Sequence, residues 1–141
     1  MTLLRTALLL FLALLSPLVH AADDAIHLTP IQIGEHSWYF QGESGAASAA
    51  NKGFMSNAGF VVTGDQVVVL DSLGSPALGQ AMIEAIRKIT PLPIKLVIAS
   101  HYHADHIYGL QAFKALGAEV WAHKNSAIYL ASDVAKQRLA Q

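Results

Sequence analysis

Three histidines and one aspartate occupy six consecutive positions in the segment HYHADH, as His101, His103, Asp105 and His106. Imidazole nitrogens and a carboxylate are donor types that suit zinc. The sequence contains no cysteine, so a metal site in this chain must use nitrogen and oxygen ligands. The segment therefore predicts a zinc site; the alternatives for such a run are a solvated polar loop and an adventitious metal binder.

The spacing of these residues predicts how they share the metal. Residues two apart in an extended segment project the same way, so we expect His101 and His103 to bind one ion. Asp105 and His106 follow the turn into a helix and are expected to serve a second ion nearby. Two ions about 3.5–4 Å apart can share a water, lower its pKa from about 15.7 to about 7, and polarise a carbonyl or phosphoryl oxygen.

Two predicted elements position this segment. The apolar run IKLVIAS predicts a buried strand that ends near Ser100, and IYGLQAFKALGA predicts a helix that begins near His106 and ends at Gly117. The donors then lie at the carboxyl end of a strand, which is where open α/β sheets place their ligands.

The remaining pattern predicts an α/β (α+β) fold. Strands are expected at 26–33 and 37–42, then an irregular loop at 43–53 and a hairpin at 57–72. Ser75 and Pro76 predict the start of a helix with an apolar stripe formed by Leu78, Met82, Ile86 and Ile89. A strand at 119–123 and a helix from Asn125 to the last residue complete an order of β-meander followed by helix–strand alternation.

Composition and the amino-terminal segment restrict the class of protein. Nine Lys plus Arg stand against ten Asp plus Glu, with no basic stripe, so we expect a small-molecule substrate and no nucleic-acid partner. Residues 1–21 read as a signal peptide, with Arg5, an apolar run and a cleavage site after Ala21. The alternative, an uncleaved anchor, is disfavoured because the run is shorter than about 20 residues. The prediction is a periplasmic or secreted protein without a membrane span after cleavage.

The segment HYHADH resembles the His-x-His-x-Asp-His signature of the metallo-β-lactamase superfamily. NAGFVVTGDQVVVLDSLGSP resembles that superfamily's early hairpin, and residues 94–123 resemble its strand, metal loop, helix and next strand. The resemblance covers 26–141. It implies the first half of an αββα sandwich, so that residues 22–141 form a partial domain, and two zinc ions in the complete protein.

The resemblance also implies roles for individual residues. His101 and His103 would bind the first zinc, and Asp105 and His106 the second, with Asp105 as the catalytic residue that also orients the hydroxide. Asp71 would support a ligand from behind; its alternative role is that of a turn or cap residue at the end of a strand.

The chain departs from the family in length. Members run to roughly twice the mature length, and the ligands of their second half have no match here. His123 is expected either at the mouth of the site or in a structural role. One sheet face would expose its apolar residues, so we interpret the chain as the N-terminal part of a hydrolase. The alternative is a half-domain that completes its sheet by dimerising.

The predicted function is that of a secreted, zinc-dependent, β-lactamase-like hydrolase in which metal-bound hydroxide attacks an amide or thioester carbonyl. One alternative is a glyoxalase-II-like thioester hydrolase. Another is an inactive zinc-binding fragment without turnover, because the chain offers only two ligands for each ion.

Overall fold

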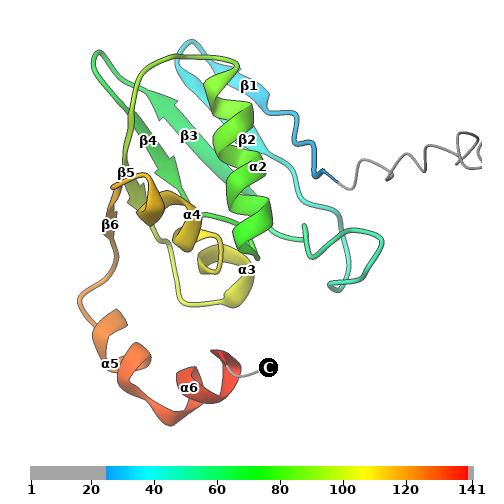
Figure 1. Cartoon of the computed structure of the whole chain (residues 1–141), viewed down its shortest axis with the longest axis vertical. Helices are drawn as coiled ribbons and strands as arrows, with labels where there is room; N and C mark the ends of the chain where they lie inside the picture. Colours follow the sequence, from blue (N-terminus) through cyan, green and yellow to red (C-terminus); the bar gives the residue numbers. More distant parts are fainter. Residues whose placement is uncertain (1–24, 140–141) are drawn as a thin grey trace, which may run out of the picture.

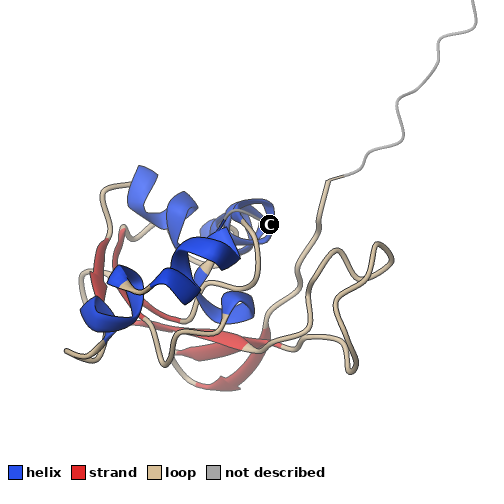
Figure 2. Ribbon diagram, turned by 90° about the horizontal axis from the view of Figure 1, so that it is seen from below, coloured by secondary structure: helices blue, strands red, loops and turns tan. Residues whose placement is uncertain are grey.

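The computed structural model describes residues 25–139, so the predicted signal peptide lies outside the described part. The described residues form a six-stranded sheet whose strands follow one another in sequence order. Figure 2 shows the helices gathered on one side of this sheet. The mixed α/β architecture predicted from the sequence is confirmed.

The first four strands form an antiparallel meander, and the last two are parallel additions. The meander consists of β1 (Ile31–Gly34), β2 (Ser37–Phe40), β3 (Ala58–Val62) and β4 (Val67–Leu70). β5 (Ile94–Ile98) pairs in parallel with β4, and β6 (Glu119–Trp121) in parallel with β5. Each parallel step needs a crossover connection, which helices supply on the covered side of the sheet (Figure 1).

The first crossover helix is α2 (Pro76–Arg87), and it begins where the sequence predicts. Ser75 Oγ accepts a hydrogen bond from Leu78 N at 3.1 Å, and Pro76 occupies the first helical position, where no N–H is needed. Leu78, Met82 and Ile86 are fully buried. This apolar stripe fixes α2 against the sheet.

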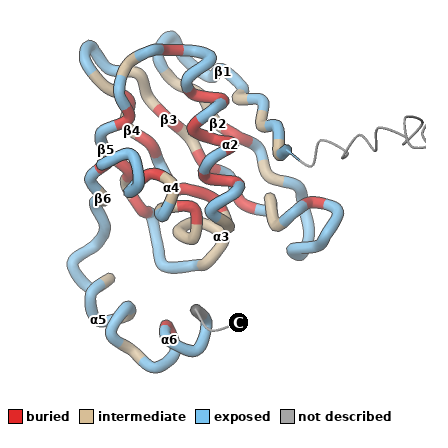
Figure 3. The backbone as a smooth tube through the Cα atoms, viewed as in Figure 1, coloured by how far each residue is buried: buried red, intermediate tan, exposed pale blue. Residues whose placement is uncertain are grey.

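The hydrophobic core lies between α2 and one face of the sheet. Phe60, Val69 and Val97 come from three adjacent strands and are almost completely inaccessible to solvent. Trp38 stacks on Phe60 with ring centroids 5.2 Å apart. Figure 3 shows buried residues concentrated in the sheet and α2, whereas the carboxyl-terminal helices are largely exposed.

The opposite face of the sheet, here called the open face, carries no helix of the described chain. Successive strand residues point to opposite faces, so residues next to core positions project from it. Ile33 is 67% exposed, Leu70 46% and Trp121 55%. The apolar open face expected from the sequence is therefore present.

The predicted helix between the histidine segment and Gly117 is divided in two. α3 (Ala104–Ile107) and α4 (Leu110–Ala115) are separated at Tyr108 and Gly109. Gly109 N donates to Leu73 O at 3.0 Å, a bond that replaces helical pairing. A side chain at Gly109 would collide with the carbonyl oxygen of Ser72. The single-helix prediction is wrong because this tertiary contact interrupts the helix.

The predicted helix from Asn125 onward is also two helices, α5 (Ser126–Ala131) and α6 (Asp133–Leu139). Ser132 between them is extended, with ψ 154°, and its Oγ accepts from Ala135 N at 3.3 Å. A serine that bonds the next turn in this way begins a new helix rather than continuing the old one.

The strand predicted at 26–33 forms only from Ile31 onward. Pro30 precedes it and has no N–H to donate to a ladder. Ile26 and Leu28 instead pack against the core as an irregular segment. Within residues 25–139, none of the helices combines the length and the apolar character that crossing a membrane requires.

Candidate metal centre

The predicted donor residues lie at the carboxyl end of β5. His101 and His103 are in the loop that follows the strand, and Asp105 and His106 are in α3. Ser72, which follows β4, donates its N–H and its hydroxyl to the carbonyl oxygen of His106 at 2.8 and 3.0 Å. The ends of two adjacent parallel strands therefore hold the donor segment in place.

The three imidazole rings form one group, here called the histidine cluster (His101, His103 and His106). The ring centroid of His101 lies 4.6 Å from that of His103 and 4.2 Å from that of His106. The sequence-based expectation assigned His106 to a separate position beside Asp105. The structure places the His106 ring beside Asp105, with Nε2 3.4 Å from the Asp105 carboxylate, and it also brings this ring close to that of His101.

Asp71 is the residue on which this arrangement depends. Its Oδ1 accepts from Ser100 N at 2.7 Å, and its Oδ2 accepts from Ser100 Oγ at 2.7 Å. His106 Nδ1 lies 2.8 Å from the same Oδ2. The Asp71 side chain is only 10% exposed, so these bonds replace the water that a carboxylate would otherwise bind.

These contacts select which ring nitrogen of two histidines is available. A carboxylate only accepts, so Nδ1 of His106 carries the hydrogen. Ser100 Oγ gives its one hydrogen to Asp71 and can only accept from His101 Nδ1, 2.9 Å away. Neutral His101 and His106 therefore both keep the lone pair on Nε2, the atom free to bind a metal.

Asp105 adds a carboxylate to the donor set. Its Oδ2 lies 3.4 Å from Nε2 of His106. Two electron-pair donors this close favour a cation between them. Ser56 Oγ donates a hydrogen bond to the Asp105 carbonyl oxygen, which anchors the first turn of α3 to the loop before β3.

The backbone at Asp71 is unusual for a residue with a side chain. Its φ is +60°, in the left-handed region, which aspartate tolerates better than most residues. Asp71 N donates to Ile98 O at 2.9 Å, which extends the pairing of β4 with β5 by one step. Asp71 therefore ends the pairing of the two strands with a left-handed backbone conformation, and its side chain contacts Ser100 and His106 from this position.

The donor types, imidazole and carboxylate, fit zinc. Within the part of the chain that the structure describes, no three His, Cys, Asp or Glu side chains are arranged to hold one metal ion. A catalytic zinc has three protein ligands and one open position.

His123, the other candidate from the sequence, makes a local contact. It follows β6, and its Nδ1 accepts from Asn125 N at 3.2 Å. This bond at the start of α5 fits the structural role rather than a position at the mouth of the site.

Sequence reasoning missed the serines that support the cluster. Ser100 connects Asp71 to His101, Ser72 holds the His106 carbonyl, and Ser56 holds the Asp105 carbonyl. Only Ser100 had a local signal, since it directly precedes the first histidine. Ser56 and Ser72 are separated from their partners by 49 and 34 positions, and no pattern in the sequence connects them.

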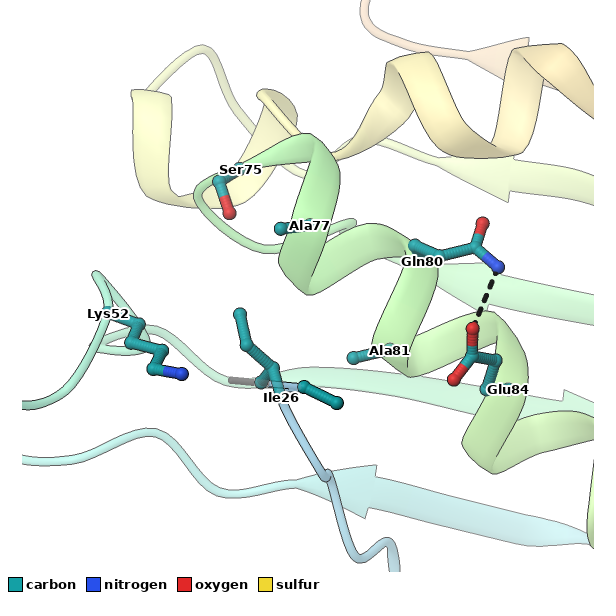
Figure 4. A pocket seen from close by; sticks show the side chains of 8 residues that line it. Ile26, Lys52, Ser75, Ala77, Gln80, Ala81 and Glu84 are labelled. Atoms are coloured by element: carbon teal, nitrogen blue, oxygen red, sulfur yellow. Dashed lines mark hydrogen bonds between the residues drawn. The ribbon is translucent and has the colours of Figure 1, made fainter. Parts of the chain in front are cut away.

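One cavity in the molecule is unconnected with the cluster. A space of about 610 Å³ lies between α2 on one side and Ile26 and Lys52 on the other (Figure 4). Its polar groups already have partners: Ser75 caps α2, and Gln80 donates to Glu84 at 3.0 Å. None of its lining residues is a candidate donor.

Comparison with known proteins gives the family. A family model described as "Metallo-beta-lactamase superfamily" matches residues 51–141, more than half of the chain. The chain therefore belongs to the metallo-β-lactamase superfamily, and the resemblance drawn from HYHADH is confirmed.

Individual relatives agree with this placement. The chain is 34% identical over 80 residues to "Metallo-beta-lactamase type 2" of Elizabethkingia meningoseptica. It superposes on a metallo-β-lactamase from Hirschia baltica with a TM-score of 0.60 at 20% identity, and on one from Pontibacter korlensis with 0.64 at 19%. At such low identities the two structures show a shared fold, and the predicted partial metallo-β-lactamase fold is confirmed.

The matched regions are partial for each relative. The alignment covers 57% of this chain and 32% of the Elizabethkingia protein. The superpositions cover 72% and 77% of this chain, and 47% and 49% of the two solved structures. The chain thus spans about half the length of the two solved relatives and about one third of the Elizabethkingia protein.

Proposed function

We propose that residues 22–141 are part of the catalytic domain of an exported zinc hydrolase and that the histidine cluster is its metal centre. The observation that carries the proposal is the chain of hydrogen bonds from Asp71 through Ser100 to His101, with a parallel bond to His106. These bonds place the Nε2 lone pairs of two clustered imidazoles at the end of a strand. Such support for ligands from behind is typical of metal sites.

The residues of the chain have distinct parts in this proposal. His101 and His103 bind one ion, and Asp105 and His106 bind the other. Asp105 also orients the attacking water through its carboxylate. When bound, zinc polarises the substrate carbonyl and makes water nucleophilic near neutral pH. Asp71 and Ser100 keep the rings fixed while charge develops in the reaction.

The substrate that we propose is an amide or a thioester. The Elizabethkingia relative is named a metallo-β-lactamase, which supports a β-lactam amide. A thioester is the second candidate, because SHYHADH resembles the Thr/Ser-His-x-His-x-Asp-His loop of glyoxalase-II-like enzymes. Both reactions need the same attack on a carbonyl carbon.

The location and assembly that we propose follow from two features. The segment of residues 1–21 supports export by a signal peptide, followed by release into the periplasm or medium.

The open face supports a partner that covers its apolar residues. A second copy of this chain is one such partner, and it would bring two histidine clusters into one assembly.

The test combines metal uptake with turnover. The exported chain is loaded with zinc, the bound zinc per chain is counted, and hydrolysis of a chromogenic cephalosporin and of a glutathione thioester is followed. We expect zinc uptake, and turnover that is lost in His101→Ala and Asp105→Ala. His36→Ala serves as the matched control, because His36 is an exposed histidine outside the cluster.

The outcomes separate the alternatives. Turnover that depends on His101 and Asp105 supports the hydrolase, and the faster of the two substrates identifies the class. Zinc uptake without turnover supports the inactive zinc-binding fragment. A chain that binds no zinc, or binds it equally well after His101→Ala, overturns the proposed metal centre.

A further inference from the structure

A second cavity touches the histidine cluster through a tyrosine. Tyr102 lies between His101 and His103, and its ring centroid is 4.4 Å from that of Tyr129 in α5. The two rings form one wall of a cavity of about 540 Å³, here called the tyrosine pocket. Its lining includes Tyr102, Asn125, Ile128, Tyr129, Val134 and Arg138.

The tyrosine pocket lies next to the proposed reaction centre. The ring of Tyr102 meets that of His103 edge to face, with centroids 5.0 Å apart. Tyr102 is 47% exposed, so one ring contacts both a candidate metal ligand and the pocket. A substrate whose carbonyl lies at the cluster can therefore extend its non-reacting part into the pocket.

Most of the lining of the tyrosine pocket is apolar or aromatic. Ile128 is 72% exposed and Val134 54% exposed, which leaves apolar surface beside the two rings. Two tyrosine rings and aliphatic groups favour a flat aromatic group, which can stack or meet a ring edge to face.

Arg138 supplies the charge. Lys136, two residues before it on α6, is paired with Asp133 at 3.1 Å. The guanidinium of Arg138 has no ion-pair partner among residues 25–139. Its backbone carbonyl accepts from Tyr108 OH at 3.4 Å, which connects this part of α6 to the segment between α3 and α4. Arg138 is one of the residues that line the cavity, and a planar guanidinium is suited to pairing with a carboxylate.

We propose that the tyrosine pocket binds the non-reacting part of the substrate and selects an aromatic ring that bears a carboxylate. Tyr102 and Tyr129 contact the ring, and Arg138 pairs with the carboxylate. The inference rests on the proposed hydrolase function, since it names the substrate class of that site. It adds a recognition site, formed by Tyr102 and by residues of α5 and α6, beside the candidate metal ligands.

The test measures binding without turnover. Phenylacetate is titrated into the exported chain, and saturation-transfer NMR records the contact of its ring with the protein. Phenylacetamide, which has the same ring and no charge, is the ligand control. We expect saturable phenylacetate binding that is about tenfold tighter than that of phenylacetamide, since a charge-assisted hydrogen bond is worth at least that factor.

Two matched pairs of variants locate the binding. Arg138→Gln should weaken phenylacetate binding about tenfold, whereas Lys136→Gln, the same loss of charge on the same helix, should leave it unchanged. Tyr129→Leu should weaken the binding of both ligands. Tyr39→Leu, on a strand outside the pocket, should weaken neither.

Each result has a defined meaning. Equal affinity for the two ligands, equal effects of Arg138→Gln and Lys136→Gln, or no saturable binding overturns the pocket assignment. Zinc uptake, measured on the same samples, tests the metal centre separately. Phenylacetate binding without zinc uptake would support the pocket and overturn the proposed hydrolase. Zinc-dependent turnover without phenylacetate binding would support the hydrolase and overturn the pocket assignment.

Discussion

Asp71 accepts three hydrogen bonds with a side chain that is 10% exposed, and all three reach the donor segment after β5. One carboxylate thereby orients His106 directly and His101 through Ser100. Loss of such a support group commonly weakens metal binding by about 10–100-fold. At the scale of single residues, the candidate site consists of the candidate ligands and of the two residues, Asp71 and Ser100, that orient the His101 and His106 rings.

Ser100→Ala is expected to weaken zinc binding. The substitution removes the hydroxyl that fixes His101 Nδ1 and one of the bonds to Asp71, so the ring of His101 can rotate and change tautomer. We expect a loss of affinity of about tenfold, measured by competition with a chelating dye. Ser100→Thr keeps the hydroxyl and should restore most of the affinity. Equal affinity in the alanine variant would show that the relay does not position His101.

Asp105→Asn tests the carboxylate itself. The amide keeps the shape of the side chain but removes the charge that faces His106 Nε2 at 3.4 Å. We expect zinc affinity to fall by about 10–100-fold. Asp65→Asn, in the turn between β3 and β4, is the control and should leave zinc binding unchanged. Unchanged stoichiometry and affinity in Asp105→Asn would mean that Asp105 is not a ligand.

At the scale of elements, the packing of α2 against α4 determines where α3 ends. A side chain at Gly79 would lie 2.6 Å from Gly109 O, and one at Gly109 would collide with the carbonyl of Ser72. Two glycines therefore allow the close approach of α2, the segment after β4 and the start of α4. This close packing also brings the segment after β4 to α3, where Ser72 N donates to His106 O and the His106 ring lies beside Asp71.

Gly109→Ala is expected to destabilise the fold. Its methyl group would force apart segments that are hydrogen-bonded through Gly109 N and Leu73 O. The free energy of unfolding in urea should fall by about 1–3 kcal/mol, the usual cost of overpacking. Gly64→Ala is the matched control, since nothing lies within 4 Å of the added atom and the change should be close to neutral. An equal effect of the two substitutions would contradict the packing argument.

The sequence predicted elements best where their signals are local. The start of α2 at Ser75 and Pro76 needs only neighbouring residues, and the HYHADH segment contains its own donors. The division at Gly109 depends on the carbonyl of Ser72, and the Asp71–Ser100–His106 contacts join positions 29 and 35 apart. Interactions of this kind exist only after the strands pair, so composition and periodicity do not contain them.

At the scale of the whole molecule, the sheet is covered by helices on one side and open on the other (Figure 2). Exposed apolar patches of this kind mark interfaces or lead to association. Leu70 and Trp121 lie on adjacent parts of the open face, since β5 pairs with both β4 and β6. We expect the chain alone to associate through this face.

Trp121→Lys is expected to reduce that association. The substitution replaces a 55% exposed indole with a charge at the edge strand of the open face. Sedimentation velocity should show a shift toward monomer, with a dissociation constant raised about tenfold or more, the effect of losing about 1.4 kcal/mol. Leu116→Lys, which removes a 41% exposed apolar residue on the helical side, should leave association unchanged. Identical sedimentation of the parent chain and both variants would exclude the open face as an interface.

The parallel pairing of β4 with β5 has a consequence for the order of assembly. Asp71 follows one of these strands and the donor segment follows the other, and α2, which connects them in the chain, must form and pack against the sheet. Parallel pairing through a crossover requires closure of a long loop and is slow compared with helix formation. We therefore expect zinc binding at the proposed metal centre to wait for this step, so the rate of zinc uptake during refolding should follow the closure of the crossover.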